Sequence, residues 1–181
     1  MKKLFAVAGL FLFIFASCSS KNYNLDSKPV VTFKTSLGDI QVQFYKNAAP
    51  KTVEAFLDLI KQKKYAGTSV DEVMFANSVI SIGFNEKVLV YNIKENLAEE
   101  AAVAEKKKLE KNELLFRADN EAFGAFSIYC GDSAIEMTEP LVIFGKVTGG
   151  AEVLSKMLDM RVDKDFRPSE KIMITDTVIA E

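Results

Sequence analysis

Short apolar segments separated by turn residues recur from Pro29 to the C-terminus, and this pattern constrains the fold more than any other feature. In residues 30–35 and 40–45 apolar and polar side chains alternate, and residues 37–39 form a turn between them. Such alternation is typical of strands with one buried face. Similar segments occupy residues 79–80, 88–90, 114–116, 125–130, 141–147 and 171–178. Many short strands favour a mainly β fold, a closed barrel of antiparallel strands.

Two segments carry the spacing of amphipathic helices. Pro50 suits a first helical turn, and one apolar stripe follows it: Val53, Phe56, Leu57 and Ile60. We expect this helix to end at residues 65–67. A second helix is expected after residues 149–150, where Val153, Leu154 and Met157 lie on one side. These two helices are predicted to cap the barrel.

Residues 97–111 differ from the rest of the chain in composition. They are rich in Ala, Leu, Glu and Lys, which are strong helix formers. Glu and Lys recur at i, i+4 spacing, which suits a solvated helix. We therefore predict an extra, charged helix on the surface.

Composition excludes several classes of function. The 181 residues carry a net charge of −2, with basic residues in short runs of mixed sign, so a nucleic-acid surface is not expected. The chain has no His and only two Cys, which argues against a metal site and against the usual acid–base group at neutral pH. No cofactor is expected.

The N-terminus reads as a targeting segment. Lys2 and Lys3 precede an apolar run over residues 4–15, and small residues then precede Cys18. Phe15-Ala16-Ser17-Cys18 resembles the lipobox of bacterial lipoproteins, in which the cysteine thiol receives a diacylglyceryl group. We predict a signal peptide over residues 1–17, a flexible tether over residues 18–28 and one domain over residues 29–181. The alternative is an ordinary secretory signal that has a cysteine near its cleavage site.

This resemblance implies a lipid-anchored protein of the bacterial cell envelope, on a periplasmic or surface face. Lipidation would consume the Cys18 sulfur and leave Cys130 as a lone thiol. An oxidising envelope would otherwise allow a Cys18–Cys130 disulfide. Because Cys130 lies in an apolar segment and no His exists to activate it, we expect a buried, unreactive side chain.

The order of motifs along residues 29–181 resembles the cyclophilin family of peptidyl-prolyl isomerases. The matching motifs are Thr35 to Ile40, Ala49 to Val53 with Phe56, Tyr65 to Thr68, Phe144 to Val147, and Arg167-Pro168. The resemblance implies a cyclophilin-like barrel that binds polypeptide segments, including those that contain proline. It also implies catalysis of rotation about X–Pro bonds, which face a barrier near 18–20 kcal/mol.

The residues that this family uses for catalysis are replaced here. Glu72 stands at the position of the catalytic arginine, Ser81 near a glutamine, and Ser127, after Phe126, at a phenylalanine that packs on the proline ring. Glu136 and Leu141 stand in for a tryptophan and a histidine. A carboxylate cannot donate the hydrogen bond that a guanidinium gives to the prolyl nitrogen.

Three functions follow from these replacements. The first is a membrane-anchored protein that binds or scaffolds polypeptides through a degenerate isomerase site, with an acidic patch of Asp71, Glu72 and Glu136 that prefers basic or polar segments. The second is an active isomerase that assists the folding of secreted proteins, for which Arg117 is a candidate substitute guanidinium. The third is a purely architectural lipoprotein.

Overall fold

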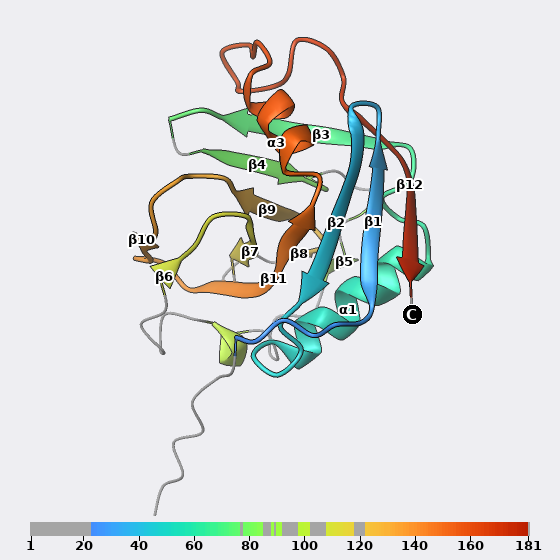
Figure 1. The fold of residues 1–181 in the computed structure, drawn as a ribbon, viewed down its shortest axis with the longest axis vertical. Coiled ribbons are helices and arrows are strands. Elements are labelled where there is room, and N and C mark those ends of the chain that lie inside the picture. Colours follow the sequence, from blue (N-terminus) through green and yellow to red (C-terminus); the bar gives the residue numbers. More distant parts are fainter. Residues whose placement is uncertain are drawn as a thin grey trace, which may run out of the picture.

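A computed structural model describes residues 23–76, 78–84, 88, 90–91, 98–101, 108–117 and 122–180 (Figure 1). Eight antiparallel strands close into a barrel in the order β1-β12-β3-β4-β9-β7-β11-β2. Their bounds are β1 (Val30–Thr35), β2 (Gly38–Phe44), β3 (Thr68–Met74), β4 (Val79–Ile82), β7 (Glu113–Arg117), β9 (Phe126–Tyr129), β11 (Leu141–Gly149) and β12 (Met173–Ala180). The predicted closed antiparallel barrel is confirmed.

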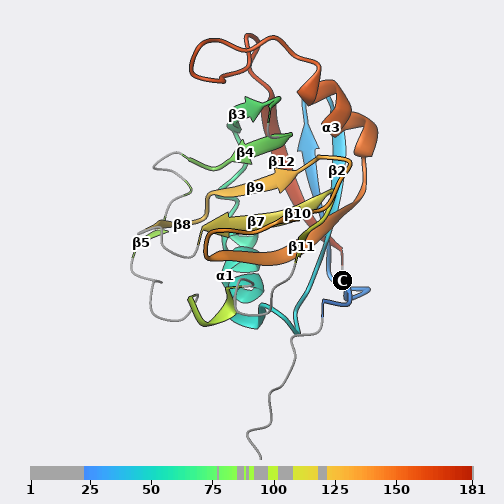
Figure 2. The same cartoon turned by 90° about the vertical axis from the view of Figure 1, so that its left-hand side faces the viewer.

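Two helices cover the barrel, as predicted. Helix α1 (Pro50–Lys61) lies at one end of the barrel, and α3 (Ala151–Leu158) packs on the outside beside β2 and β3 (Figures 1 and 2). Helix α1 ends at Lys61, before the predicted residues 65–67, because the chain turns at Lys63, whose φ is 56°. Tyr65 is instead a fully buried core residue whose hydroxyl donates to the Gly124 carbonyl over 2.6 Å.

The core is an aromatic cluster inside the barrel. Phe56 of α1 lies 5.0 Å from Phe144 and 5.3 Å from Phe126, measured between ring centroids, and Phe33 lies 5.6 Å from Tyr65. Tilted and edge-to-face pairs of this kind contribute about 0.5–1.5 kcal/mol each beyond the area they bury. The cluster therefore joins α1 to strands from both halves of the sequence.

The described part of residues 97–111 does not form the predicted surface helix. Residues Ala98–Glu100 form a single 3₁₀ turn (η1), and Lys108–Leu109 form strand β6, which pairs with β10 (Ile135–Glu136). A second short pair joins β5 (Val90–Tyr91) to β8 (Ala122–Phe123). Residues 102–107 lie outside the described ranges. Helix propensity is outweighed here by contacts that η1 and β6 make with distant parts of the chain.

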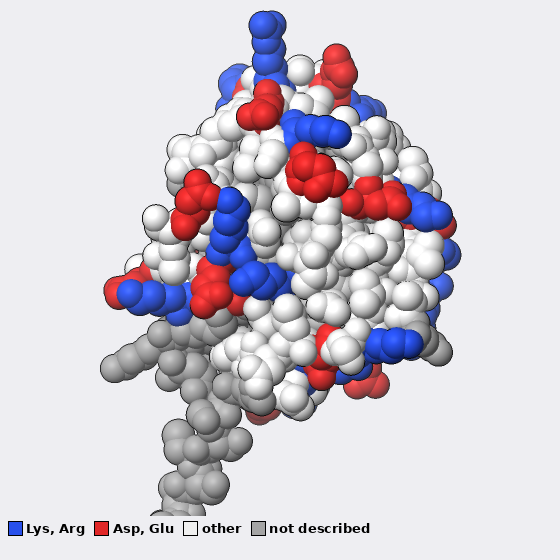
Figure 3. Space-filling model, in the orientation of Figure 1, with Lys and Arg blue, Asp and Glu red and all other residues white. Residues whose placement is uncertain are grey.

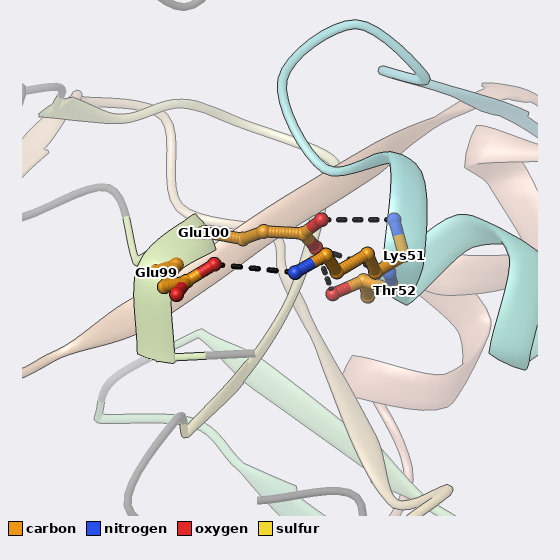
Figure 4. A network of polar contacts seen from close by, with 4 residues as sticks. All are labelled: Lys51, Thr52, Glu99 and Glu100. Atoms are coloured by element: carbon orange, nitrogen blue, oxygen red, sulfur yellow. Dashed lines mark hydrogen bonds and ion pairs between the residues drawn. The ribbon is translucent and has the colours of Figure 1, made fainter. Parts of the chain in front are cut away.

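The contact of η1 is with the start of α1 (Figure 4). The carboxylate of Glu100 accepts hydrogen bonds from the backbone N–H of Lys51 (2.8 Å), the backbone N–H of Thr52 (3.0 Å) and the Thr52 hydroxyl (2.6 Å). The N-cap residue of α1, Ala49, has no side chain able to cap the helix. Glu100 therefore satisfies N–H groups that the helix itself leaves unpaired.

The chain packs on the barrel before the predicted domain boundary at Pro29. Asp26 donates its N–H to the Phe44 carbonyl and accepts the Lys46 N–H, and the Tyr23 and Tyr45 rings lie 5.6 Å apart. Of the predicted tether, residues 23–28 thus belong to the folded unit. Residues 1–22, with the predicted signal peptide and Cys18, lie outside the described ranges. No helix among the described residues is long and apolar enough to cross a membrane.

Candidate functional site

A β-bulge in β3 sets the geometry of the site. Val70 pairs with Ile82, but the next paired residue of β3 is Glu72, opposite Ser81, so Asp71 is the extra residue. A bulge of this kind interrupts the alternation of the strand. Val70 and Val73 both remain buried in the barrel core, whereas Asp71 and Glu72 are both partly exposed. The bulge therefore places two neighbouring carboxylates on the outer face.

Three of the predicted site residues form a row across adjacent strands. Glu72 of β3 pairs with Ser81 of β4, and Ser81 pairs with Ser127 of β9. The two serine Oγ atoms lie 3.2 Å apart. Because neighbouring strands are about 4.8 Å apart, the row spans about 10 Å. The structure thus brings together three residues that the sequence resemblance predicts to stand at the arginine, glutamine and phenylalanine positions.

A cleft of about 430 Å³ opens beside Glu72, between β3 and the loop that precedes β12. The loop is held against β3 by the Val73 N–H, which donates to the Phe166 carbonyl over 2.8 Å. The lining residues are Ser69, Val70, Asp71, Glu72, Phe84, Asp163, Arg167, Pro168, Ser169 and Lys171. Those from the loop and Phe84 were not predicted as site residues, because only the folded chain brings them to β3.

Some charged groups of the cleft have hydrogen-bond partners within the protein, and others have none among the described residues. Asp71 accepts the Phe84 N–H over 2.9 Å; burial raises the pKa of Asp71, and the N–H groups of Phe84 and Gly83 oppose that rise. Asp163 accepts two backbone N–H groups of its own loop. Within the described part of the chain, neither the Glu72 carboxylate nor the Arg167 guanidinium forms an ion pair or side-chain hydrogen bond. These two groups are available to a ligand.

Three exposed phenylalanines surround the same strand. Phe84 lines the cleft and is 50% exposed, Phe75 follows the end of β3 and is 44% exposed, and Phe166 lies in the loop beside Val73 and is 47% exposed. Only Phe84 of the three lines the cleft, and three exposed rings next to one strand make this side of β3 a candidate binding surface. On the face shown in Figure 3, acidic and basic side chains are interspersed without a large area of one sign.

The other predicted site residues lie away from the cleft. Phe126 packs inside the barrel and is 2% exposed. Arg117, at the end of β7, is paired with Glu139, with 2.6 Å between Nη1 and Oε2. Leu141 lies opposite Arg117 at the start of β11. None of the three residues lines the cleft or is in cross-strand register with Glu72, Ser81 and Ser127.

Glu136 also lies apart from the predicted acidic patch. It is on β10, is largely exposed, and lies 3.6 Å from the Lys108 ammonium. Three acidic residues line the cleft: Asp71 and Glu72, which are neighbours on β3, and Asp163 of the loop.

Cys130 is buried and unpaired with another cysteine in the described chain. Burial raises the pKa of its thiol to about 12, so the thiol is protonated at neutral pH. Among the described residues, no three His, Cys, Asp or Glu side chains are grouped so that they could hold a metal ion.

Comparison with known proteins supports the resemblance found in the sequence. The family model described as cyclophilin type peptidyl-prolyl cis-trans isomerase/CLD matches residues 30–179. The chain is 30% identical to the Arabidopsis thaliana peptidyl-prolyl cis-trans isomerase CYP23 over 81% of its length and 69% of that protein. It is 26% identical to the human peptidyl-prolyl cis-trans isomerase-like 4, of which it spans only 33%.

Solved structures show the same fold. A cyclophilin type peptidyl-prolyl cis-trans isomerase from Cryptosporidium parvum superposes with a TM-score of 0.66 at 21% identity, over 84% of this chain and 98% of that one. Its crystal structure in the presence of the dipeptide Ala-Pro superposes with a TM-score of 0.65.

Proposed function

Because the chain belongs to the cyclophilin-type peptidyl-prolyl cis-trans isomerase family, we propose that it is an envelope-anchored protein that binds polypeptide segments through a degenerate isomerase site. The observation that carries this proposal is the position of Glu72. It lies on the outer face of β3, in register with Ser81 and Ser127, where the family resemblance places the catalytic arginine.

The loss of catalysis follows from the chemistry of that position. As the imide twists, its nitrogen gains a lone pair that needs a hydrogen-bond donor. The Glu72 carboxylate offers only acceptors. Removal of one preorganised donor from an enzyme typically costs about 2.7–4 kcal/mol, or 10²–10³ in rate. Ser127 in place of a phenylalanine also removes an apolar wall for the proline ring.

Binding does not need that donor. The cleft offers the available Glu72 carboxylate, Asp71 and the exposed Phe84 ring. The exposed Phe75 and Phe166 lie next to β3 outside the cleft. From Asp71 to Phe75 the strand extends about 13 Å, the length of about four extended residues. These features suit an unfolded segment, with or without proline, in which a basic side chain lies next to apolar ones.

Isomerase activity is tested by a protease-coupled assay with proline-containing peptides. We expect a rate at least 100-fold below that of an ordinary cyclophilin. Glu72→Arg alone should raise the rate less than tenfold, because Ser127 still leaves the proline ring without an apolar wall. Glu72→Arg combined with Ser127→Phe should raise the rate further. A wild-type rate within tenfold of an ordinary cyclophilin would refute the proposal.

Binding is tested with extended peptides that carry a central lysine between phenylalanines, and with the same peptides carrying glutamate. We expect the lysine peptide to bind more tightly, and Glu72→Gln to weaken its binding. Glu54→Gln, an exposed position on α1, is the matched control and should bind as the wild type does. Equal binding by Glu72→Gln and Glu54→Gln would show that the cleft is not the binding surface.

The anchor is tested separately. The diacylglyceryl group proposed for Cys18 predicts that the processed chain partitions into the detergent phase, and that Cys18→Ser abolishes both the lipid mass and processing at that residue. Partition of Cys18→Ser unchanged from the wild type would overturn the anchor without affecting the cleft.

An active isomerase is the second candidate. Two observations favour it: the matched relatives are named as isomerases, and the Arg167 guanidinium lines the same cleft as Glu72. In that case Arg167→Gln should abolish a substantial wild-type rate. The two candidates are distinguished by the first measurement of the wild-type rate.

A further inference from the structure

A second concave surface lies far from the cleft, where the chain first meets the barrel. It has a volume of about 370 Å³ and is lined by Lys28, Pro29, Lys46, Leu57, Lys61 and Ile179, which we call the basic groove. Its floor is apolar, and every charged side chain that lines it is a lysine. Nothing in the proposed binding of polypeptides uses it.

We propose that the basic groove binds the headgroup of an anionic phospholipid in the membrane to which the chain is anchored. The charges fit this ligand. An anionic leaflet attracts lysines near its surface, each by about 1 kcal/mol, or about fivefold in binding. The apolar Leu57 and Ile179 suit the glycerol and upper acyl carbons that accompany such a headgroup.

The contacts of Lys46 and Lys61 allow these side chains to bind a phosphate. The Lys46 ammonium donates to the Lys28 carbonyl over 2.7 Å, which leaves two of its N–H groups for a phosphate. Lys61 lies 3.3 Å from Asp58, but both side chains are more than half exposed, so the pair is weak and can exchange for a phosphate oxygen. Asp26 also lies near the groove, and one of its carboxylate oxygens accepts the Lys46 backbone N–H.

The place at which the described chain begins argues for this ligand over others. Tyr23 packs on Tyr45, next to Lys46 of the groove. Between Cys18 and Tyr23 the chain can span at most about 17 Å, even when fully extended. A lipid on Cys18 would therefore hold this end of the barrel close to the bilayer surface. This inference rests on the proposed anchor.

The arrangement also orients the molecule. Residues 23–29 lie at the end of the barrel opposite the loop between α3 and β12, which forms one wall of the cleft (Figure 1). A groove bound to headgroups would direct the cleft away from the bilayer, toward polypeptides in the aqueous compartment.

The test uses the processed, lipid-anchored chain in vesicles of phosphatidylcholine, or of phosphatidylcholine with phosphatidylglycerol in equal parts. Lysines are acylated with a water-soluble reagent, and the modified positions are quantified by mass spectrometry. We expect Lys28, Lys46 and Lys61 to react at least fivefold more slowly with phosphatidylglycerol present, and 0.5 M salt to remove most of that protection. The exposed Lys156 and Lys164 serve as internal controls and should react equally in both vesicles.

The outcomes are distinct. Equal acylation of the groove lysines in both vesicles would overturn the inference while leaving the anchor intact. Failure of the chain to float with either vesicle would refute the anchor and, with it, this ligand. Slow acylation of the groove lysines in detergent micelles free of anionic lipid would indicate another occupant, such as an acidic protein segment. That result would also overturn the inference. Substitution of the three groove lysines with glutamine should abolish the difference between vesicles, whereas Lys34→Gln with Lys156→Gln and Lys164→Gln should not.

Discussion

Replacement of Glu100 by alanine should destabilise the whole barrel, although Glu100 lies in a segment that the sequence alone predicts to be a surface helix. The side chain is 6% exposed and accepts hydrogen bonds from two backbone N–H groups and one hydroxyl at the start of α1. Glu100→Ala removes all three acceptor contacts at once, and it leaves the fully buried Thr52 without that partner.

The expected cost can be worked from these contacts. Loss of a helix cap costs about 0.5–2 kcal/mol. A buried hydroxyl left unsatisfied costs about 1–3 kcal/mol more. We therefore expect the free energy of unfolding to fall by about 2–4 kcal/mol, which lowers the Tm by roughly 5–15 °C in a domain of this size. Glu100→Gln should lose less, because one oxygen remains to accept the N–H groups.

The assay is urea unfolding followed by circular dichroism, with thermal unfolding as a second measure. Glu99 provides the matched control, since it is the neighbouring residue, its side chain is 72% exposed, and it forms an ion pair with Lys51 at the surface (Figure 4). Glu99→Ala should change stability by no more than about 0.5 kcal/mol. If Glu100→Ala and Glu99→Ala were equally stable, the capping role assigned to Glu100 would be wrong.

Three further predictions concern single residues of the barrel and of α3. Because burial raises the pKa of Cys130 to about 12, iodoacetamide at pH 8 should modify it only after unfolding, and rapid modification of the native protein would contradict this. Gly150→Ala should lower the midpoint of urea unfolding clearly, since Gly150 has a φ of 83° and an added Cβ would lie 2.2 Å from the Asp39 carbonyl oxygen; an unchanged midpoint would contradict it. Burial and the neighbouring Glu113 carboxylate raise the pKa of Tyr45, so the unfolded chain releases that proton first and stability should fall as the pH rises above about 10. Tyr45→Phe should remove that part of the decline; a pH dependence identical to the wild type would refute the assignment.

The sequence by itself determined seven of the eight barrel strands and the two helices. Strand β3, which carries Glu72, was not among the predicted strands, because the bulge at Asp71 interrupts its alternation. Alternation in residues 30–35 and 40–45 marks a hairpin with one buried face, and the stripe from Val53 to Ile60 marks the buried side of α1. Such patterns are local, because each strand or helix must present its apolar side to the same core whatever its partner is. The assignment of Glu72 to the position of an expected arginine came instead from the family resemblance, and it stays a prediction.

Tertiary structure alone decided which distant groups meet. The loop that carries Asp163 and Arg167 becomes a wall of the cleft only because it packs against β3, about 90 residues earlier in the chain. Glu100 caps a helix that begins 50 residues before it, instead of lying on a surface helix of its own. Propensity and periodicity describe neighbours within one element, whereas a hydrogen bond to an unpaired N–H depends on where the fold has left that group unsatisfied.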